Sequence, residues 1–160
     1  MNNLWENIFG KYWLLIKTLK ARLSLRACNQ IWYFTNIYPT ARIGRCNSIG
    51  SYTEIGDGVE IGDYNRIGAH CFIPECVSIG SNCFIAPRVT FTNDKYPPSG
   101  KPNWKHTVIE DDVAIGAGST ILPGVRIKKG ALIGAGSVVT HDIGENEVWC
   151  GNPAKFRRKR

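Results

Sequence analysis

Several features that would assign a chain to a common class are missing from this sequence. No apolar run approaches the ~18 residues of a membrane-spanning helix, so no transmembrane segment is expected. The first residues lack a basic region, a clean apolar stretch and a small-residue cleavage site, so no secretory signal is expected. The six cysteines form no CxxC pair and no zinc-finger spacing with histidine. We therefore predict no metal and six reduced, cytosolic thiols.

Most of the chain carries little net charge. The net charge of 160 residues is +7, but residues 1–30 carry +4 and residues 151–160 carry +5, which leaves −2 on the body. A nucleic-acid-binding domain would be expected to carry a basic stripe on its folded body, so no nucleic-acid partner is predicted. Basic ends on a mildly acidic body favour a phosphorylated small molecule, an anionic lipid, or both. A hydrophobic share of 43% excludes wholesale disorder, and the length suits one domain.

A six-residue period dominates the sequence. An apolar residue recurs at seventeen positions in one register, the fourth residue after it is usually small or β-branched, and glycine often follows it directly. The apolar positions are Ile31, Ile37, Ile43, Ile49, Ile55, Ile61, Ile67, Ile73, Ile79, Ile85, Phe91, Ile109, Ile115, Ile121, Ile127, Ile133 and Val139. Neither a helix nor a single strand has this period. Three short strands of six residues, closing one turn of eighteen, do have it, so the sequence predicts an all-β triangular coil of roughly five turns with parallel strands. Cys71 and Cys83 fall on inward positions and are predicted to act as small hydrophobes.

The period breaks at residues 92–107, where four Pro and Gly residues within six positions predict a loop rather than strands. A loop this long is usually functional. Ile109 lies eighteen residues after Phe91, so we expect the register to survive the break. Residues eighteen apart should stack on one edge of the prism, which groups Asp57, Glu75, Asn93 and Asp111 on one edge, and Ala117 and Ala135 on another.

The two ends differ from the repeat. Apolar residues recur at three- to four-residue spacing over residues 3–28, which predicts an N-terminal helical segment within residues 1–30. Such a helix would cap the open end of the coil, or it would lie in a membrane interface. Residues 31–155 form the predicted coil domain, and residues 156–160 are a basic tail.

The repeat, with the closing segment Gly151–Lys155, resembles the hexapeptide-repeat acyltransferase family. The resemblance implies a left-handed parallel β-helix, an exception to the usual handedness of crossovers. It also implies a homotrimer with acyl-CoA bound between subunits, near Ala117 and Ala135. Lys155, directly before the basic tail, is a further candidate for contact with CoA.

The segment Phe91–Asp94, followed by Tyr96 and Pro97, resembles the signature of nucleotide-linked amino-sugar N-acetyltransferases. This resemblance suggests Asn93 as a candidate catalytic residue and Asp94, Tyr96 and Trp104 as candidate substrate-binding residues. Glu75, one coil below Asn93, and His106, the histidine of the loop, are further catalytic candidates from their positions. Sugar O-acetyltransferases carry a histidine base at the loop entrance, because a hydroxyl must lose its proton to attack. The sequence has Tyr96 near that place, which favours an amine acceptor.

The predicted function is transfer of an acetyl group from acetyl-CoA to an amino group of a nucleotide-linked sugar, for surface polysaccharide such as lipopolysaccharide. The alternatives are a sugar O-acetyltransferase with a histidine base and a non-catalytic or metal-binding β-helix. A carbonic anhydrase would pair His70 with His106, two coils apart, but Asp111 stands where the third histidine is needed. The expected location is the cytoplasm, with peripheral membrane contact through the N-terminal helix as an option.

Overall fold

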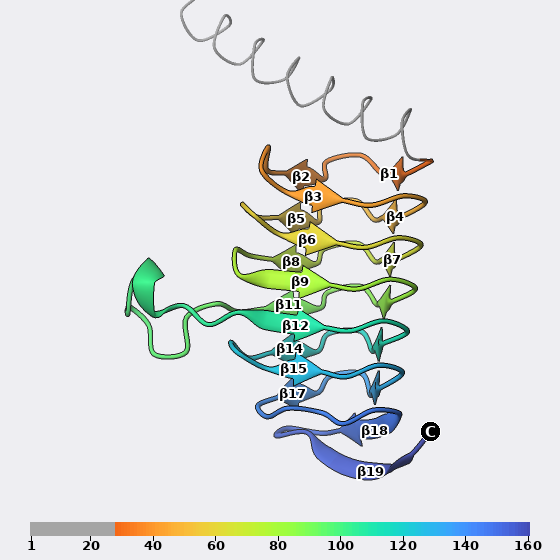
Figure 1. Ribbon diagram of the computed structural model, residues 1–160, viewed down its shortest axis with the longest axis vertical. Helices are drawn as coiled ribbons and strands as arrows, with labels where there is room; N and C mark the ends of the chain where they lie inside the picture. The colour runs from red at the N-terminus through yellow and green to blue at the C-terminus, as the bar shows by residue number, and fades with distance from the viewer. Residues whose placement is uncertain (1–27) are drawn as a thin grey trace, which may run out of the picture.

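The computed structural model describes residues 28–160, which form a triangular prism of three parallel sheets wound as a left-handed parallel β-helix (Figure 1). The predicted helical segment of residues 1–30 lies almost entirely outside this range. Within residues 28–160, the structure contains no helix with the length and apolarity that crossing a membrane requires.

The chain visits the three sheets in turn. Sheet A contains β1 (Gln30–Ile31), β4 (Ser48–Ile49), β7 (Arg66–Ile67), β10 (Phe84–Ile85), β13 (Ala114–Ile115), β16 (Leu132–Ile133), β18 (Glu147–Cys150) and β19 (Lys155–Lys159). Sheet B contains β2 (Asn36–Ile37), β5 (Glu54–Ile55), β8 (Phe72–Ile73), β11 (Thr90–Phe91), β14 (Thr120–Ile121) and β17 (Val138–Val139). Sheet C contains β3 (Arg42–Ile43), β6 (Glu60–Ile61), β9 (Val77–Ile79), β12 (Thr107–Ile109) and β15 (Arg126–Ile127). Sheet A has eight strands, of which all but β19 run parallel, so the coil has more turns than the roughly five predicted.

The six-residue period sets the core. The repeated apolar positions are buried along the axis of the prism, except Ile31 and Ile43 near its N-terminal end, which are partly buried. Most of the small residues four positions later are buried too, and Cys71 and Cys83 are among them as predicted. Burial raises the pKa of the Cys83 thiol to about 11, which keeps it protonated and suits its role as a small hydrophobe. Tight stacking also constrains the turns, since a Cβ on Gly116 would overlap the backbone of Ala135.

The long loop changes which sheet the chain joins when it returns to the prism, and this corrects the prediction that Asp111 shares an edge with Asn93. Ile109 pairs with Ile79 on sheet C, thirty residues earlier, whereas the coils before the loop and the next ones after it repeat every eighteen residues, and the last repeats after sixteen. The break therefore adds twelve residues to one coil, and Ile109 does not stack on Phe91. The six-residue phase hides this shift, because twelve residues equal two sides of the triangle. Asp111 consequently stacks on Ser81 and not on Asn93. Its carboxylate accepts a hydrogen bond from the Ser81 amide at 2.7 Å.

The prediction that all six cysteines are reduced is wrong for one pair. Cys28 and Cys46 form a disulfide, with their Cα atoms 4.6 Å apart. The two residues are separated by eighteen positions, so the coil stacks them on the edge between sheets C and A. The repeat itself thus brings the two side chains into range. The other four cysteines are free.

Candidate active site

The edge between sheets B and C, called the B–C edge, carries the residues predicted to handle the acceptor. Asp57, Glu75 and Asn93 each lie two residues beyond a sheet B strand and so occupy successive levels of this edge. They line one cavity of about 170 Å³ together with Trp104 from the loop. The remaining lining residues are Tyr38, Glu54, Gly56, Phe72 and Pro74. The stacking of residues eighteen apart therefore placed three of the four expected side chains correctly, and Asp111 was the error.

The long loop leaves the prism at this edge and folds back onto it (Figure 1). A 3-10 helix, η1 (Lys101–Asn103), lies at its outer end. The amide of Lys105 donates to the carbonyl of Asn93 at 3.1 Å, which closes the base of the loop. The ammonium of Lys101 donates to Glu75 Oε1 at 2.8 Å and lies 5.7 Å from the centroid of the Trp104 ring. The loop thus forms one wall of the cavity.

Asp94 organises the loop from within. Its carboxylate accepts hydrogen bonds from the Ser99 hydroxyl at 2.6 Å, the Ser99 amide at 2.8 Å and the Tyr96 amide at 3.1 Å. The Ser99 side chain and then the Ser99 amide are the main reasons that the pKa of Asp94 is lowered from its ordinary value. The Trp104 indole N–H is buried close by, without a well-formed hydrogen bond. Asp94, predicted to bind substrate, therefore has its oxygens engaged by the loop.

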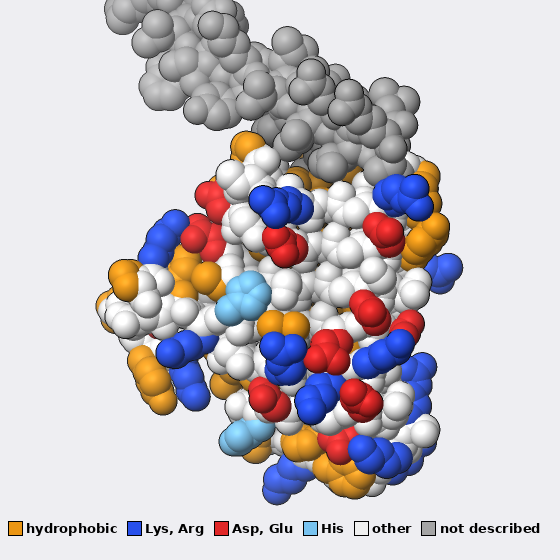
Figure 2. All heavy atoms as spheres, in the orientation of Figure 1, with side chains coloured by type: hydrophobic (Ala, Val, Ile, Leu, Met, Phe, Trp, Pro, Cys, Tyr) orange, Lys and Arg blue, Asp and Glu red, His pale blue; other side chains and the backbone are white. Residues whose placement is uncertain are grey.

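Tyr96 lies away from the cavity. Its side chain is among the most exposed aromatic groups, at 76%, and borders a separate hollow within the loop. The ammonium of Lys95 sits 5.8 Å from the Tyr96 ring centroid, a cation–π contact. In Figure 2 the projecting loop presents hydrophobic and basic side chains together. Of the three residues predicted to bind substrate, only Trp104 lines the cavity with Asn93 and Glu75.

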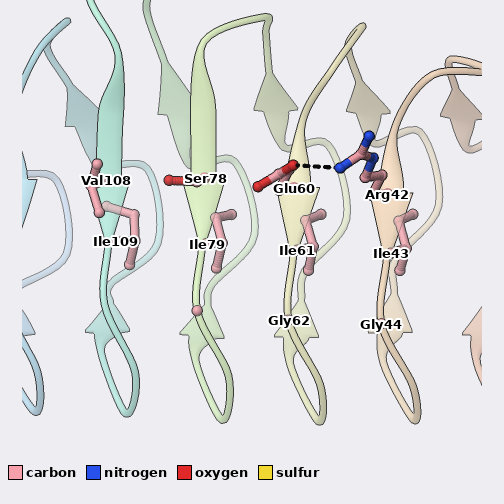
Figure 3. Close-up of a pocket in the computed structure, with 11 residues that line it drawn as sticks. Arg42, Ile43, Gly44, Glu60, Ile61, Gly62, Ser78, Ile79, Val108 and Ile109 are labelled. Carbon is pink, nitrogen blue, oxygen red and sulfur yellow. Dashed lines mark hydrogen bonds and ion pairs between the residues drawn. The ribbon is translucent and has the colours of Figure 1, made fainter.

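His106 belongs to a different surface. Its Nε2 lies 3.1 Å from the hydroxyl of Ser78, which projects from sheet C. Ser78 stands in a row with Val108, Glu60 and Arg42 over a shallow hollow of about 620 Å³ (Figure 3). Glu60 and Arg42 form an exposed ion pair there, at 3.3 Å. His106 is therefore not among the residues that line the Asn93 cavity, although the amide of its neighbour Thr107 donates to the carbonyl of Cys76, next to Glu75.

His70 does not align with His106 either. His70 lies on the edge between sheets A and B, called the A–B edge, where its ring stacks on Tyr52 at 5.0 Å, and Tyr52 stacks on Phe34 at 5.0 Å. The two-coil pairing required of a carbonic anhydrase fails, because the loop displaces His106 by two sides of the triangle. Residues 28–160 contain no group of three or more His, Cys, Asp or Glu side chains suited to a metal ion.

Ala117 and Ala135 do stack as predicted, on the A–B edge. The Gly136 amide donates to the carbonyl of Ala117 at 2.8 Å, which locks the two levels together. Both alanines are exposed, and a Cβ added to Gly118 or Gly136 would meet no atom within 4 Å. This stretch of edge, which carries only alanine and glycine, can accept a long flexible chain such as the pantetheine arm of CoA. Lys155 is exposed at the start of β19, two strands beyond β16 in sheet A.

Two residues at these surfaces were not singled out from the sequence, Lys101 and Ser78. Lys101 lies in the interruption, where no repeat fixes a position, so only the folded loop shows that it reaches Glu75. Ser78 occupies an outward position on sheet C and pairs with Val108 in the structure. Counting eighteen residues along the sequence does not connect Ser78 with Val108, because the loop lengthens the coil between them to thirty residues.

Comparisons with known proteins agree with this architecture. The family model of the bacterial transferase hexapeptide (six repeats) matches residues 40–75, 58–93 and 106–141. A 2,3,4,5-tetrahydropyridine-2,6-dicarboxylate N-acetyltransferase from Staphylococcus aureus (strain JH9) is 51% identical over 59 residues, which cover 37% of the chain and 23% of that enzyme. The chain thus matches about a quarter of the length of this curated relative.

Solved structures share the fold at low sequence identity. A variant of AntD, an N-acyltransferase from Bacillus cereus, in complex with dTDP and coenzyme A, gives a TM-score of 0.74 at 20% identity over 88% of both chains. PerB from Caulobacter crescentus, in complex with CoA and GDP-perosamine, gives 0.62 at 21% identity over 81% of this chain and 57% of that one. The family model covers more than half of the chain, and its repeats coincide with the coils of the prism. The chain therefore belongs to the bacterial transferase hexapeptide family.

Proposed function

We propose that the protein is an acetyltransferase that moves an acetyl group from acetyl-CoA to an amino group of a nucleotide-linked sugar. The observation that carries this proposal is the cavity on the B–C edge. It holds a carboxylate, Glu75, and an amide, Asn93, on neighbouring levels beside the Trp104 ring, and none of the residues that line it is a histidine. Carboxylate and amide groups can hold an amine and orient its lone pair.

The chemistry of an amine acceptor fits such a cavity. A hydroxyl needs a base to become a useful nucleophile, whereas a neutral amine needs mainly to be positioned. The amine nitrogen attacks the thioester carbonyl, the carbon–sulfur bond breaks, and the departing thiolate can take the proton that nitrogen loses. Glu75 and Asn93 would hold and orient the amine, and Trp104 would shield one side of the cavity. Acetyl-CoA would supply the activated acetyl group.

The donor would lie on the A–B edge, along Ala117 and Ala135, with Lys155 as a candidate contact for its phosphates. Sheet B separates this edge from the acceptor cavity. A homotrimer would bring the A–B edge of one copy to the B–C edge of another, and we propose that assembly for this reason. A monomeric particle in light scattering at micromolar concentration, with activity retained, would refute the shared site.

The nucleotide-linked substrate is supported by the relatives. PerB was crystallised with GDP-perosamine, and AntD with dTDP-4-amino-4,6-dideoxyglucose. Sugars of this kind would serve the assembly of surface polysaccharide, lipopolysaccharide included, and we place the protein in the cytoplasm on the same argument. Contact of residues 1–27 with the inner face of the membrane stays a prediction.

One observation favours a second candidate, a sugar O-acetyltransferase. The His106 ring touches the Ser78 hydroxyl at 3.1 Å at the rim of the hollow on sheet C, so a histidine base exists on that face. An acceptor hydroxyl bound there could pass its proton to His106. The two candidates use different faces of the prism, which makes them separable by mutation.

The test is an acceptor panel. The protein is incubated with acetyl-CoA and either dTDP-4-amino-4,6-dideoxyglucose or GDP-perosamine, with dTDP and GDP as controls that lack the amine, and free thiol is followed. We expect thiol release with an amino sugar and background rates with the controls. Release with deaminated sugars that retain their hydroxyl groups would favour the O-acetyltransferase. Failure to bind acetyl-CoA by calorimetry would favour a non-catalytic β-helix.

A further inference from the structure

One ammonium group of the chain already lies against the proposed acceptor cavity. The Lys101 ammonium is 2.8 Å from Glu75 Oε1, and the face of the Trp104 ring lies 5.7 Å away. Asp57, one level below Glu75 on the B–C edge, is a second carboxylate near Lys101. A carboxylate at hydrogen-bond distance, a second negative charge and an aromatic face are the groups that proteins use to bind an organic cation.

Lys101 is not needed to build this environment. Glu75 and Asp57 are held by the coil on successive levels of the prism. The loop that carries Trp104 is fixed independently of the Lys101 side chain, by the bond between Lys105 and Asn93, by the Ser99 hydrogen bonds to Asp94 and by the Trp104 amide, which donates to the Lys101 backbone carbonyl at 3.1 Å. Removing the Lys101 ammonium should therefore leave both walls of the cavity in place.

The contact between Lys101 and Glu75 is weak enough to be exchanged. The Lys101 side chain is 66% exposed, and the Glu75 side chain is 29% exposed. Ion pairs with this degree of exposure contribute little, because water screens the attraction and ordering a lysine costs entropy. Another ammonium that also makes contacts elsewhere in the cavity can replace Lys101.

We propose that Glu75, Asp57 and the Trp104 ring form a subsite for a primary ammonium group, which Lys101 fills in the unliganded protein and which the amine of the substrate takes over by displacing Lys101. This inference rests on the proposed function, since it names how that function selects its acceptor. The acceptor binds as the ammonium ion and passes one proton to the adjacent Glu75 carboxylate, and the neutral amine then attacks the thioester. Lys101 is thus a specificity-determining residue. A hydroxyl or an amide carries no positive charge to replace the lysine, so the exchange favours amino sugars.

The exchange has a measurable consequence. While Lys101 occupies the subsite, the apparent dissociation constant of a competing ammonium is divided by the fraction of molecules in which the subsite is open. The upper end of the range for exposed ion pairs corresponds to roughly a fivefold effect. Removing the lysine charge should therefore tighten ammonium binding by about fivefold, whereas a lysine that merely stabilises the loop would weaken binding when removed.

The test uses n-butylamine, which is protonated at pH 7, with 1-butanol as the uncharged probe. Binding is followed by nuclear magnetic resonance titration of the Trp104 indole N–H signal, assigned with Trp104→Phe. We expect Lys101→Met to bind butylammonium about fivefold more tightly than the unmodified chain, and 1-butanol equally weakly in both. Lys101→Arg and Lys95→Met, the latter a lysine of the same loop, should behave like the unmodified chain.

Glu75→Gln provides the second arm, because it removes the carboxylate and keeps the shape of the side chain. This variant should lose most of the affinity for butylammonium. Unchanged or weaker binding in Lys101→Met, with the indole signal of the unliganded protein still in place, would overturn the proposal. Equal affinity of Glu75→Gln and the unmodified chain would overturn it as well.

The outcomes separate this inference from the proposed function. If butylammonium binds as expected but no amino sugar releases thiol from acetyl-CoA, the subsite stands and the acetyltransferase fails. If an amino sugar is acetylated but Lys101→Met shows no lower KM for it, the acetyltransferase stands and the exchange fails. A lower KM in Lys101→Met together with tighter butylammonium binding supports both.

Discussion

Replacement of Asn93 by alanine separates the two candidate sites of this protein most directly. Asn93 lies on the B–C edge in the acceptor cavity, and its backbone carbonyl, which accepts the Lys105 amide at 3.1 Å, survives in the variant. The substitution therefore removes a positioning group without opening the loop. Misplacement of a reacting group can cost about 100-fold in rate, which corresponds to about 2.7 kcal/mol of transition-state stabilisation. We expect Asn93→Ala to lower kcat by at least this factor.

The matched variant is His106→Ala. Its ring contacts Ser78 on sheet C and lies outside the acceptor cavity, so its loss should cost less than about 10-fold, below the range for a true general base. Steady-state thiol release with the amino sugar that serves as substrate measures both variants, and circular dichroism checks that each is folded. An inactive His106→Ala beside a nearly normal Asn93→Ala would refute the amine mechanism and assign the chemistry to the sheet C face.

Three further predictions follow from the coil and its edges. Ala135→Trp should fill the bare A–B edge and weaken acetyl-CoA binding at least tenfold, about 1.4 kcal/mol, in calorimetry; unchanged binding would place the donor elsewhere. Phe91→Ala empties a fully buried core position and should lower the free energy of unfolding by about 3–5 kcal/mol in a denaturant titration. Because Ser99 lowers the pKa of Asp94, the loop order that Asp94 supports is complete above the ordinary carboxyl pKa and is lost as pH falls through the lowered value. Hydrogen-exchange measurements should show that the Ser99 amide loses its protection at such acidic pH. Equal protection at neutral and strongly acidic pH would contradict this.

The stacking of residues eighteen apart shows how far a repeat can be read without coordinates. Within the unbroken part of the coil it placed Asp57, Glu75 and Asn93 on one edge, and beyond the loop it placed Ala117 and Ala135 on another. It failed across the loop, because an insertion of twelve residues keeps the six-residue phase while moving the chain on by two faces.

The amino-acid sequence by itself determined the coil and its core, because a period of six that alternates large apolar with small residues is satisfied by few structures other than three short strands per turn. It also located the loop, through its proline and glycine content. Only the tertiary structure decided which surface each loop residue faces, since loop side chains follow no period. The contact of Lys101 with Glu75 and that of His106 with Ser78 both depend on distances in space that the chain sets only when it is folded.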